Sequence, residues 1–289
     1  MTVGHSPTVR RRQLIAELKR LRESAGLTQE GVAGRLDWHH TKVFRIESGR
    51  TGPHPNDVRV MLDVFGVTDR VQREALVQLA KDGRQRGWWY SYRDVLPGRY
   101  EFFIGLEEEA VSIRAFELAV VPGLLQTEDY ARALAHSGPL EFDCQEIERR
   151  IEVRMTRQHV LDKSDRPQLW AILDESAIRR LVGGQAVMRA QLQRLVTMSE
   201  QGKTTIQVVP YNVGAHPGTA GSFMILGFAD PGEIGMVYME TVGGNISVDK
   251  AEEVQHYVTA FDHLRAVALS PDETRVMLLA RSEALIKPL

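Results

Sequence analysis

The segment 26–50 contains two short amphipathic stretches only three residues apart, and this spacing restricts the possible fold more than any other feature of the sequence. Thr28 is a suitable N-cap for a helix over 29–36. A second helix is expected over 40–48, and Gly49 is suited to end it. Two short helices joined by a tight turn are typical of the helix-turn-helix arrangement.

Further helices are expected on both sides of this pair. Before it, apolar residues recur at helical spacing and predict a helix over 10–25; these residues are Leu14, Leu18, Leu21 and Ala25. After it, helices are expected over 56–65 and 68–81. Residues 1–82 are therefore predicted to form one compact all-α domain.

Charge is distributed unevenly along the chain. The whole sequence has a formal charge of −2, but residues 1–82 carry +4 and residues 83–289 carry −6. Lys and Arg neutralise phosphates locally, so a basic N-terminal part on an acidic remainder indicates that only the former meets a polyanion. On charge alone, an ordinary protein surface explains the asymmetry equally well.

The sequence GLTQEGVAGRLDWHHTKVFRIESGR over 26–50 resembles the helix-turn-helix of Xre-type regulators, the group that includes the phage lambda repressor. The matching residues are Leu27, Thr28, Gln29, Val32, Ala33, Leu36, Val43, Ile46, Glu47 and Gly49. One residue departs from the family pattern, because Asp37 stands where the turn usually has glycine. Aspartate tolerates a positive φ, so we expect the turn to survive at a small cost.

The resemblance implies that seven residues meet double-stranded DNA: Gln29, His40, Thr41, Lys42, Phe44, Arg45 and Arg50. Arg45 is expected to contact guanine O6 and N7, with His40 and Thr41 on base edges or phosphates. The remaining polar residues of this set are expected to contact phosphates. Phe44 either touches thymine methyl groups or packs on the end of the preceding helix.

The resemblance also implies a structural ion pair between Arg22 and Glu47, which stiffens the domain without touching DNA. The run Arg10, Arg11 and Arg12 is either an arm that binds the DNA backbone or the solvated start of a helix. A single short recognition helix reads few base pairs, so the regulator is expected to be a homodimer.

Residues 83–104 are predicted to be an aromatic packed connector. Trp88, Trp89, Tyr90 and Tyr92 fall within five positions, which favours packing over a flexible linker. An aromatic platform for nucleic acid is the alternative, but such platforms normally lie on strands with basic neighbours.

Residues 105–289 are predicted to form a larger mixed α/β domain, which makes the whole chain α+β. Helices are expected over 106–114, 128–136, 144–161, 175–181, 185–201, 250–268 and 271–285. Strands are expected over 116–121, 169–173, 205–209, 222–228 and 235–240, with a possible further strand over 246–248.

Four blocks of this domain resemble the C-terminal domain of actinomycete Xre-type regulators that is likened to Scr1-type antitoxins. They are VPGLLQTEDYARAL (121–134), RMTRQHVL (154–161), LDESAIRRLVGG (173–184) and YNVGAHPGTAGSF (211–223). The resemblance runs from about 88 to 280 and implies a domain that senses a small-molecule effector or binds a small protein encoded by a neighbouring gene.

Two loops of these blocks are the candidate exposed edge for a ligand or partner. The first contributes Pro122, Gly123 and Gln126, and the second contributes His216. For His216, a loop histidine satisfied by backbone carbonyls is the simpler alternative.

No enzyme signature emerges, and we expect neither cofactor nor metal. Ser222, His216 and Asp230 would allow a triad by composition, but no G-x-S-x-G elbow is present. The single cysteine, Cys144, excludes a cysteine-cluster zinc site, and the neighbours His39 and His40 lack a third ligand nearby.

The N-terminus has no apolar core of a signal peptide, and no apolar run is long enough to span a membrane. The protein is expected in the cytoplasm, at the nucleoid when it is bound to DNA.

The sequence as a whole predicts a dimeric, sequence-specific DNA-binding transcription regulator, for example a repressor, whose C-terminal domain receives a ligand or protein signal. The alternative is an antitoxin-like component that binds a small neighbour-encoded protein and autoregulates its operon.

Overall fold

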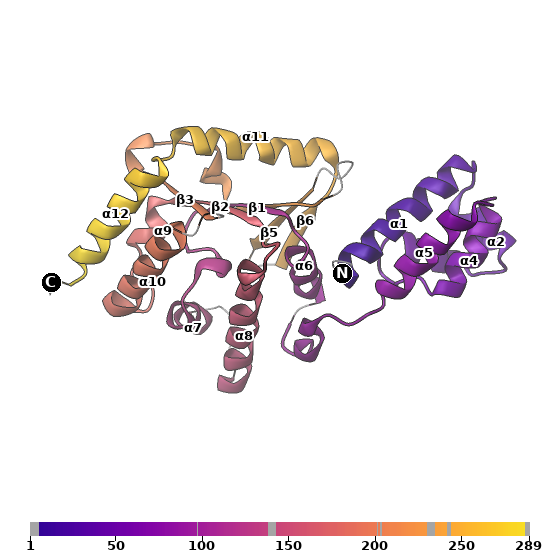
Figure 1. The fold of residues 1–289 in the computed structure, drawn as a ribbon, viewed down its shortest axis with the longest axis horizontal. Coiled ribbons are helices and arrows are strands. Elements are labelled where there is room, and N and C mark those ends of the chain that lie inside the picture. Colours follow the sequence, from indigo (N-terminus) through magenta and orange to yellow (C-terminus); the bar gives the residue numbers. More distant parts are fainter. Residues whose placement is uncertain are drawn as a thin grey trace. The chain divides into compact units, whose positions relative to one another are not determined.

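A computed structural model describes residues 6–96, 98–137, 143–200, 202, 204–229, 235–241 and 244–286. The chain divides into two compact units, Met1–Ser91 and Tyr92–Leu289, which are described separately (Figure 1).

Short helices with capped starts build the N-terminal unit. Thr28 accepts a hydrogen bond from the backbone N–H of Gly31 (3.0 Å) at one start, and Asp69 accepts from that of Val71 (3.1 Å) at another. Such side chains satisfy backbone donors that a helix leaves unpaired in its first turn. The described helices are α1 (Pro7–Ser24), α2 (Gln29–Arg35), α3 (His40–Glu47), α4 (Pro55–Val64) and α5 (Arg70–Asp82), followed by the 3-10 helix η1 (Trp88–Tyr92).

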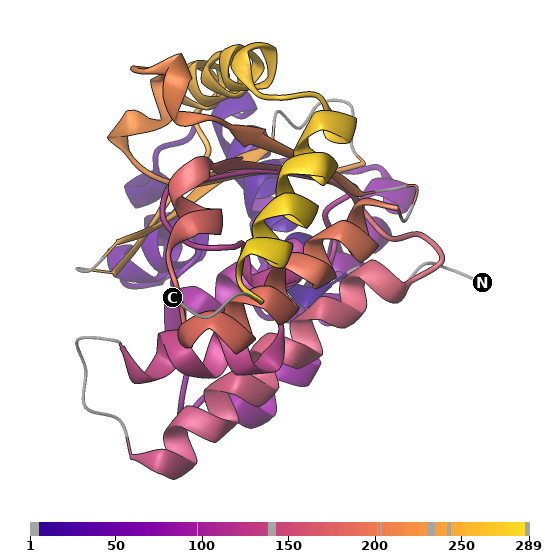
Figure 2. The same ribbon diagram turned by 90° about the vertical axis from the view of Figure 1, so that its left-hand side faces the viewer.

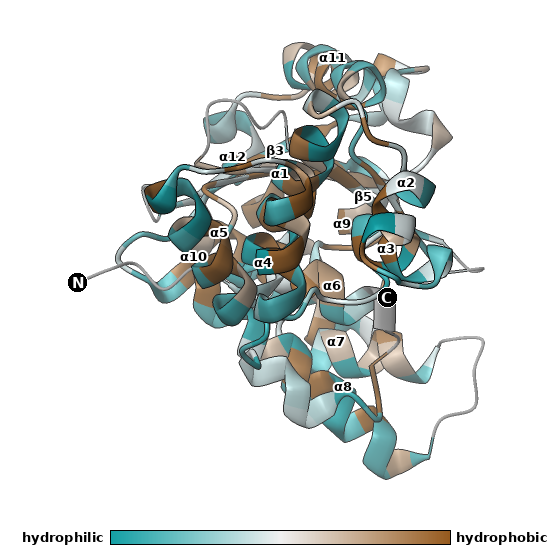
Figure 3. Ribbon diagram, turned by 90° about the vertical axis from the view of Figure 1, so that its right-hand side faces the viewer, coloured by the Kyte–Doolittle hydropathy of each residue, from teal (hydrophilic) through white to brown (hydrophobic). Residues whose placement is uncertain are grey.

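One apolar core holds these five helices together. Figure 3 shows α1, α4 and α5 with both hydrophobic and hydrophilic residues, as expected for amphipathic helices that bury one side. The buried residues are Leu14, Leu18, Val32, Ala33, Val43, Ile46, Val58, Met61, Leu62, Phe65, Leu76, Val77 and Ala80. Because every helix contributes to this core, the orientation of α3 is fixed by packing rather than by its own short sequence.

A mixed sheet of six described strands is the centre of the C-terminal unit, in the order β3-β2-β1-β4-β5-β6. β1 pairs in parallel with β2 and antiparallel with β4, and β2 pairs in parallel with β3. β5 is antiparallel to both β4 and β6. The strands are β1 (Ser112–Glu117), β2 (Gln168–Asp174), β3 (Thr204–Val209), β4 (Phe223–Gly227), β5 (Met236–Thr241) and β6 (Gly244–Val248).

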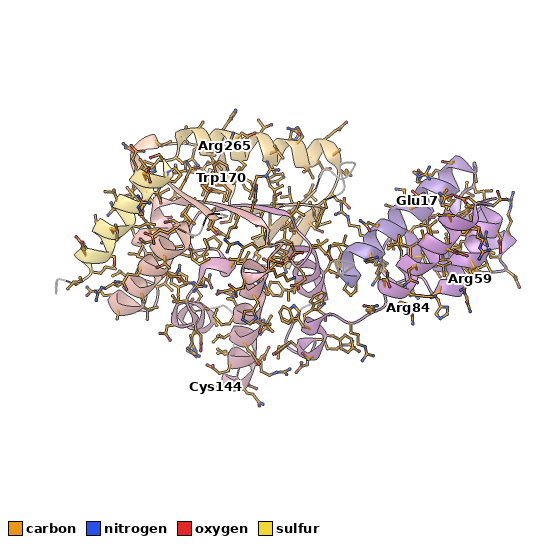
Figure 4. All side chains as sticks on the ribbon, viewed as in Figure 1. Glu17, Arg59, Arg84, Cys144, Trp170 and Arg265 are labelled. Atoms are coloured by element: carbon orange, nitrogen blue, oxygen red, sulfur yellow. The ribbon has the colours of Figure 1, made fainter. Side chains whose placement is uncertain are left out.

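Helices cover both faces of this sheet (Figure 1). On one face lies α11 (Ala251–Val267), where Arg265 stands over the ring of Trp170 at 5.0 Å (Figure 4). On the other face lie α6 (Gly98–Glu107), α7 (Glu128–His136), α8 (Cys144–Arg157), α9 (Glu175–Arg179) and α10 (Gly184–Ser199). The last helix, α12 (Pro271–Ala284), packs along α10 and against β3 (Figure 2).

The predicted fold class, an all-α N-terminal bundle followed by a larger mixed α/β domain, is confirmed. The first helix begins at Pro7 instead of residue 10, because the Ser6 side chain accepts from the backbone N–H of Thr8 and caps it. The expected positions of a helix over 106–114 and a strand over 116–121 are wrong. α6 already ends at Glu107, and β1 occupies Ser112–Glu117. Backbone pairing with β2 and β4, which lie far away in sequence, sets this register.

The expected connector 83–104 also differs from the structure. The two units divide after Ser91, and α6 runs through the expected boundary at 104. Within the N-terminal unit, Trp88 and Trp89 pack edge to face with ring centroids 5.9 Å apart, and Trp89 is buried. These rings are therefore part of a packed cluster at the end of that unit.

Candidate nucleic-acid interface and cavity

The turn between α2 and α3 has the conformation that the helix-turn-helix arrangement needs. Asp37 has φ 53°, and it is the one non-glycine residue with positive φ in the described part of the chain. The backbone N–H of Trp38 then donates to the carbonyl of Ala33 at 2.9 Å, which closes the end of α2. Aspartate therefore adopts at this turn the positive-φ conformation that glycine adopts most readily.

The outer side of α3 presents polar and aromatic side chains to solvent. Val43 and Ile46 face the core, and this leaves an exposed side made of His40, Thr41, Phe44 and Arg45. Arg45 makes no side-chain hydrogen bond or ion pair with any residue in the described segments. An exposed helix side with an uncommitted guanidinium has the chemistry needed to read guanine in a major groove.

Neighbouring side chains orient parts of this surface. The hydroxyl of Thr41 lies 2.8 Å from Nδ1 of His39, the residue that caps α3. The guanidinium of Arg50 lies 5.4 Å from the ring centroid of Phe44, and Phe44 is 45% exposed. Phe44 thus faces solvent beside a cation.

Lys42 was expected to be a phosphate contact, and its ammonium is engaged within the unit. Its Nζ lies 2.8 Å from the Asp57 carboxylate and 3.6 Å from the ring centroid of Trp38. The local positive charge at this position is therefore largely balanced before any DNA arrives.

Arg22 of α1 and Glu47 of α3, the pair inferred from the resemblance, form an ion pair with 2.6 Å between Nε and Oε1. Their side chains are only 9% and 2% exposed. Gln29, expected to approach a phosphate, donates its side-chain amide to the same Glu47 carboxylate at 2.8 Å, and Arg22 also donates to the carbonyl of Leu27. One carboxylate therefore connects α1, α2 and α3, and the Gln29 side chain is tied to it.

The arginine run at the N-terminus is not a detached arm. Arg10, Arg11 and Arg12 all lie within α1. Arg10 pairs with Asp82 of α5 at 3.1 Å, and Arg11 donates to the carbonyl of Gly49. These contacts hold α1 against its neighbours, so neither a free arm nor a solvated helix start describes this segment.

The loop over 121–126 was expected to be an exposed edge, and this expectation is wrong. Val121, Leu124, Leu125 and Gln126 are at most 2% exposed, and Pro122 is buried beside them. Polar side chains from neighbouring elements hold the loop by its carbonyl groups. Gln158 donates to Gly123 and Gln126, and Gln191 donates to Leu125. The loop over 121–126 can be buried because side chains, rather than water, satisfy its backbone carbonyl groups.

His216 lies elsewhere and belongs to a different group of contacts. Its Nε2 is 3.4 Å from the carboxylate of Asp174, and its ring packs edge to face on Phe116. A carboxylate, rather than the expected backbone carbonyls, is therefore its partner. The structure does not bring His216 together with Gly123 and Gln126.

No catalytic triad or metal centre forms in the described segments. Ser222 accepts from the backbone N–H of Leu118 at 3.0 Å, whereas His216 faces Asp174. The third member considered, Asp230, lies outside the described residues. No three His, Cys, Asp or Glu side chains gather as metal ligands among the residues that are described.

Gly123 and Gln126 instead line a cavity of about 320 Å³ in the C-terminal unit. The cavity lies at the carboxyl end of β1, on the sheet face covered by α6, α7 and α8. At this end the chain leaves β1 toward β2 on one side, while β4 borders β1 on the other. Crevices at the carboxyl ends of parallel strands, such as β1 and β2, are the usual place for ligands in open α/β sheets.

A buried ion pair supports one wall of this cavity. Arg157 donates to both carboxylate oxygens of Glu107 at 2.8 and 2.7 Å, and both side chains are at most 5% exposed. Tyr100 contributes its hydroxyl to the same guanidinium. Burial by itself lowers the pKa of Arg157, but Glu107 and Tyr100 outweigh it and raise the pKa, so this arginine stays charged.

Glu117, the last residue of β1, is a titratable group in the lining of the cavity. Burial raises its pKa to about 7, opposed by a hydrogen bond from Ser222 and by the charge of Arg154. Nearby, Arg154 donates to Oε1 of Gln126 at 2.8 Å. No sequence motif singled out Glu117 or Glu107, and Arg157 stood only within the block over 154–161. The partner of Arg157, Glu107, lies 50 positions away along the chain.

Comparison with known families agrees with this division of the chain. Residues 13–76 match a family described as a helix-turn-helix domain. Residues 100–280, more than half of the chain, match a family described as a domain of unknown function, DUF5753. The chain belongs to the DUF5753 family. Neither the curated proteins nor the solved structures that were searched include a match to it.

The helix-turn-helix domain of this DUF5753 protein supports DNA binding and a role in transcription regulation. Across the described segments, no helix combines the length and the apolar character needed to span a membrane.

Proposed function

We propose that this protein is a sequence-specific transcription regulator of the Xre type, in which α3 reads DNA and the C-terminal unit receives a signal. The observation that carries the proposal is the exposed side of α3, with Arg45 free of side-chain partners in the described chain. Arg45 is suited to a bidentate contact with guanine, and His40 and Thr41 flank it one turn earlier. The basic N-terminal unit supplies the long-range attraction to phosphates.

We further propose that the protein binds DNA as a homodimer. α3 has 8 residues, and a helix of this length reads only a few base pairs. Two copies placed on half-sites about one helical turn apart (~34 Å) would double the sequence read. Analytical ultracentrifugation of the full chain, free and with DNA, tests this: a monomer in both states contradicts it.

The C-terminal unit is proposed to be a binding domain rather than an enzyme, with Ser222 and His216 committed to different partners. The cavity of about 320 Å³ favours a small-molecule signal. A small neighbour-encoded protein, as in an antitoxin-like system, would have to dock elsewhere than on the buried loop over 121–126. The regulator is proposed to act at the nucleoid.

Selection from random double-stranded oligonucleotides tests the proposed DNA recognition. The full chain is expected to enrich a site with two related half-sites and at least one guanine in each. Enrichment of no motif at physiological salt would contradict sequence-specific binding.

A further inference from the structure

The cavity at the end of β1 contains a polar group that nothing in the described chain satisfies. Tyr238 lines it from β5 and is only 4% exposed. Its hydroxyl is buried and has no hydrogen-bond partner among the described residues. A buried hydroxyl without a partner costs free energy, and a bound ligand is one way to remove that cost.

Charges around the cavity leave the Glu117 carboxylate without an ion-pair partner among the described residues, and the charge of Arg154 acts on it only without a direct contact. Within the described residues, Glu117 forms no ion pair, and the nearby Arg157 is neutralised by Glu107. Arg154 is held by Gln126, while Glu240 adds a second carboxylate to the lining. With Glu117 ionised, the charged lining residues and Glu107, the ion-pair partner of Arg157, carry a net charge of −1. A single positive charge on a ligand would therefore balance the charge of the site.

The rest of the wall is apolar and aromatic. Phe103 of α6 stacks on Tyr238 with ring centroids 3.9 Å apart. The other apolar lining residues are Val120, Val121, Leu134, Ala135, Phe223, Met224 and Met239. The volume of about 320 Å³ lies at the lower end of the range for small-molecule sites, ~300–1,000 Å³. Apolar and aromatic walls with a few convergent polar groups suit a compact organic cation.

We propose that this cavity binds a small amphipathic amine, whose ammonium group pairs with Glu117 and hydrogen-bonds to Tyr238 while its apolar body lies against Phe103, Met224 and Leu134. This proposal rests on the proposed function, in that it names the signal that the C-terminal unit receives. The ligand is recognised by charge and shape, and no chemical step is involved.

Binding of an ammonium group is expected to depend on the protonation of Glu117. The groups that act on this carboxyl from neighbouring elements are Ser222, Arg154 of α8, Tyr130 of α7 and Glu240 of β5. Because the pKa of Glu117 is about 7, an amine must displace a proton below that pH. The apparent affinity is therefore expected to rise about tenfold between pH 6 and pH 8.

Isothermal titration of the full chain without DNA tests the proposal. The probe is phenethylamine, compared with 3-phenylpropionate and 2-phenylethanol, which share its apolar body but are anionic and neutral. We expect phenethylamine to bind best at pH 8. Glu117→Gln should weaken it at least tenfold, and Tyr238→Phe should weaken it several-fold. Glu253→Gln on α11 removes one exposed carboxylate away from the cavity and should leave binding unchanged.

Three results would overturn the proposal: tighter binding of the anion or the alcohol, phenethylamine affinity unchanged by Glu117→Gln, or no binding of phenethylamine to the wild type. Thermal unfolding of each variant shows that it is folded, since Gln is close in shape to Glu and removes a carboxyl that burial disfavours. The titration contains no DNA, so its failure leaves DNA recognition untouched, and failure of DNA recognition leaves the titration valid.

Discussion

Glu47→Ala removes the carboxylate that links the first three helices, and it is expected to destabilise the N-terminal unit strongly. The Glu47 carboxylate accepts from Nε of Arg22 at 2.6 Å, from Nη2 of Arg22 at 3.0 Å and from Gln29 at 2.8 Å. Without it, Arg22 remains 9% exposed with the carbonyl of Leu27 and the more exposed carboxylate of Glu23 as partners. Breaking a buried pair by removing one partner costs about 3–5 kcal/mol. Because Arg22 keeps these two partners, we expect the loss of stability to lie at the lower end, at about 3 kcal/mol.

Hydrogen exchange of the full chain, followed by mass spectrometry, measures this loss where it occurs. Backbone amides of α1 and α3 should lose protection, whereas those of α11 in the other unit should not. Glu74→Ala is the matched control, because its pair with Arg70 is 66% and 88% exposed and is worth less than about 1 kcal/mol. Arg22→Met combined with Glu47→Leu should recover most of the stability, since two apolar side chains leave no buried charge. A loss below about 1 kcal/mol in Glu47→Ala would refute the reasoning.

Three further predictions concern other residues of the two units. Lys42→Ala should lower the affinity for all DNA sequences by the same small factor. Asp57→Ala frees the Lys42 ammonium and should raise the affinity for all DNA sequences by the same factor. Quantitative gel shifts on selected and random DNA measure both effects. Asp37→Val should cost about 1–2 kcal/mol because a β-branched residue resists φ 53°, whereas Asp37→Gly should be close to neutral, as urea unfolding will show. Glu107→Ala should destabilise the C-terminal unit by about 3 kcal/mol and leave the affinity for a selected DNA site unchanged in the folded protein, which calorimetry and gel shifts will measure together.

Local signals made much of the fold predictable. The cap Thr28 and the glycine Gly49 lie at the helix ends that the sequence predicted. The positive φ of Asp37 followed from the position of the turn and the tolerance of aspartate for that conformation. These features depend on residues within one or two turns of each other, which is why a single sequence reveals them.

Long-range pairing explains what the sequence did not reveal. β1 took its register from β2 and β4, so its strand lies earlier than the apolar run suggested. Glu107 and Arg157 are separated by 50 positions, and only the packing of α6 on α8 brings them together. The loop at Gly123 looked exposed because glycine and proline are typical of turns, yet side chains from distant elements bury it.

The affinity ratio between a selected DNA site and random DNA, compared for the wild type and Arg45→Ala, tests the central claim most directly. Arg70→Ala on α5 is the matched control, since it removes the same charge from an exposed position. We expect Arg45→Ala to lose about 1–3 kcal/mol of discrimination at one base pair of each half-site, while random DNA is bound almost as before. Arg70→Ala should leave the ratio unchanged. Equal losses on selected and random DNA in Arg45→Ala would contradict recognition through α3.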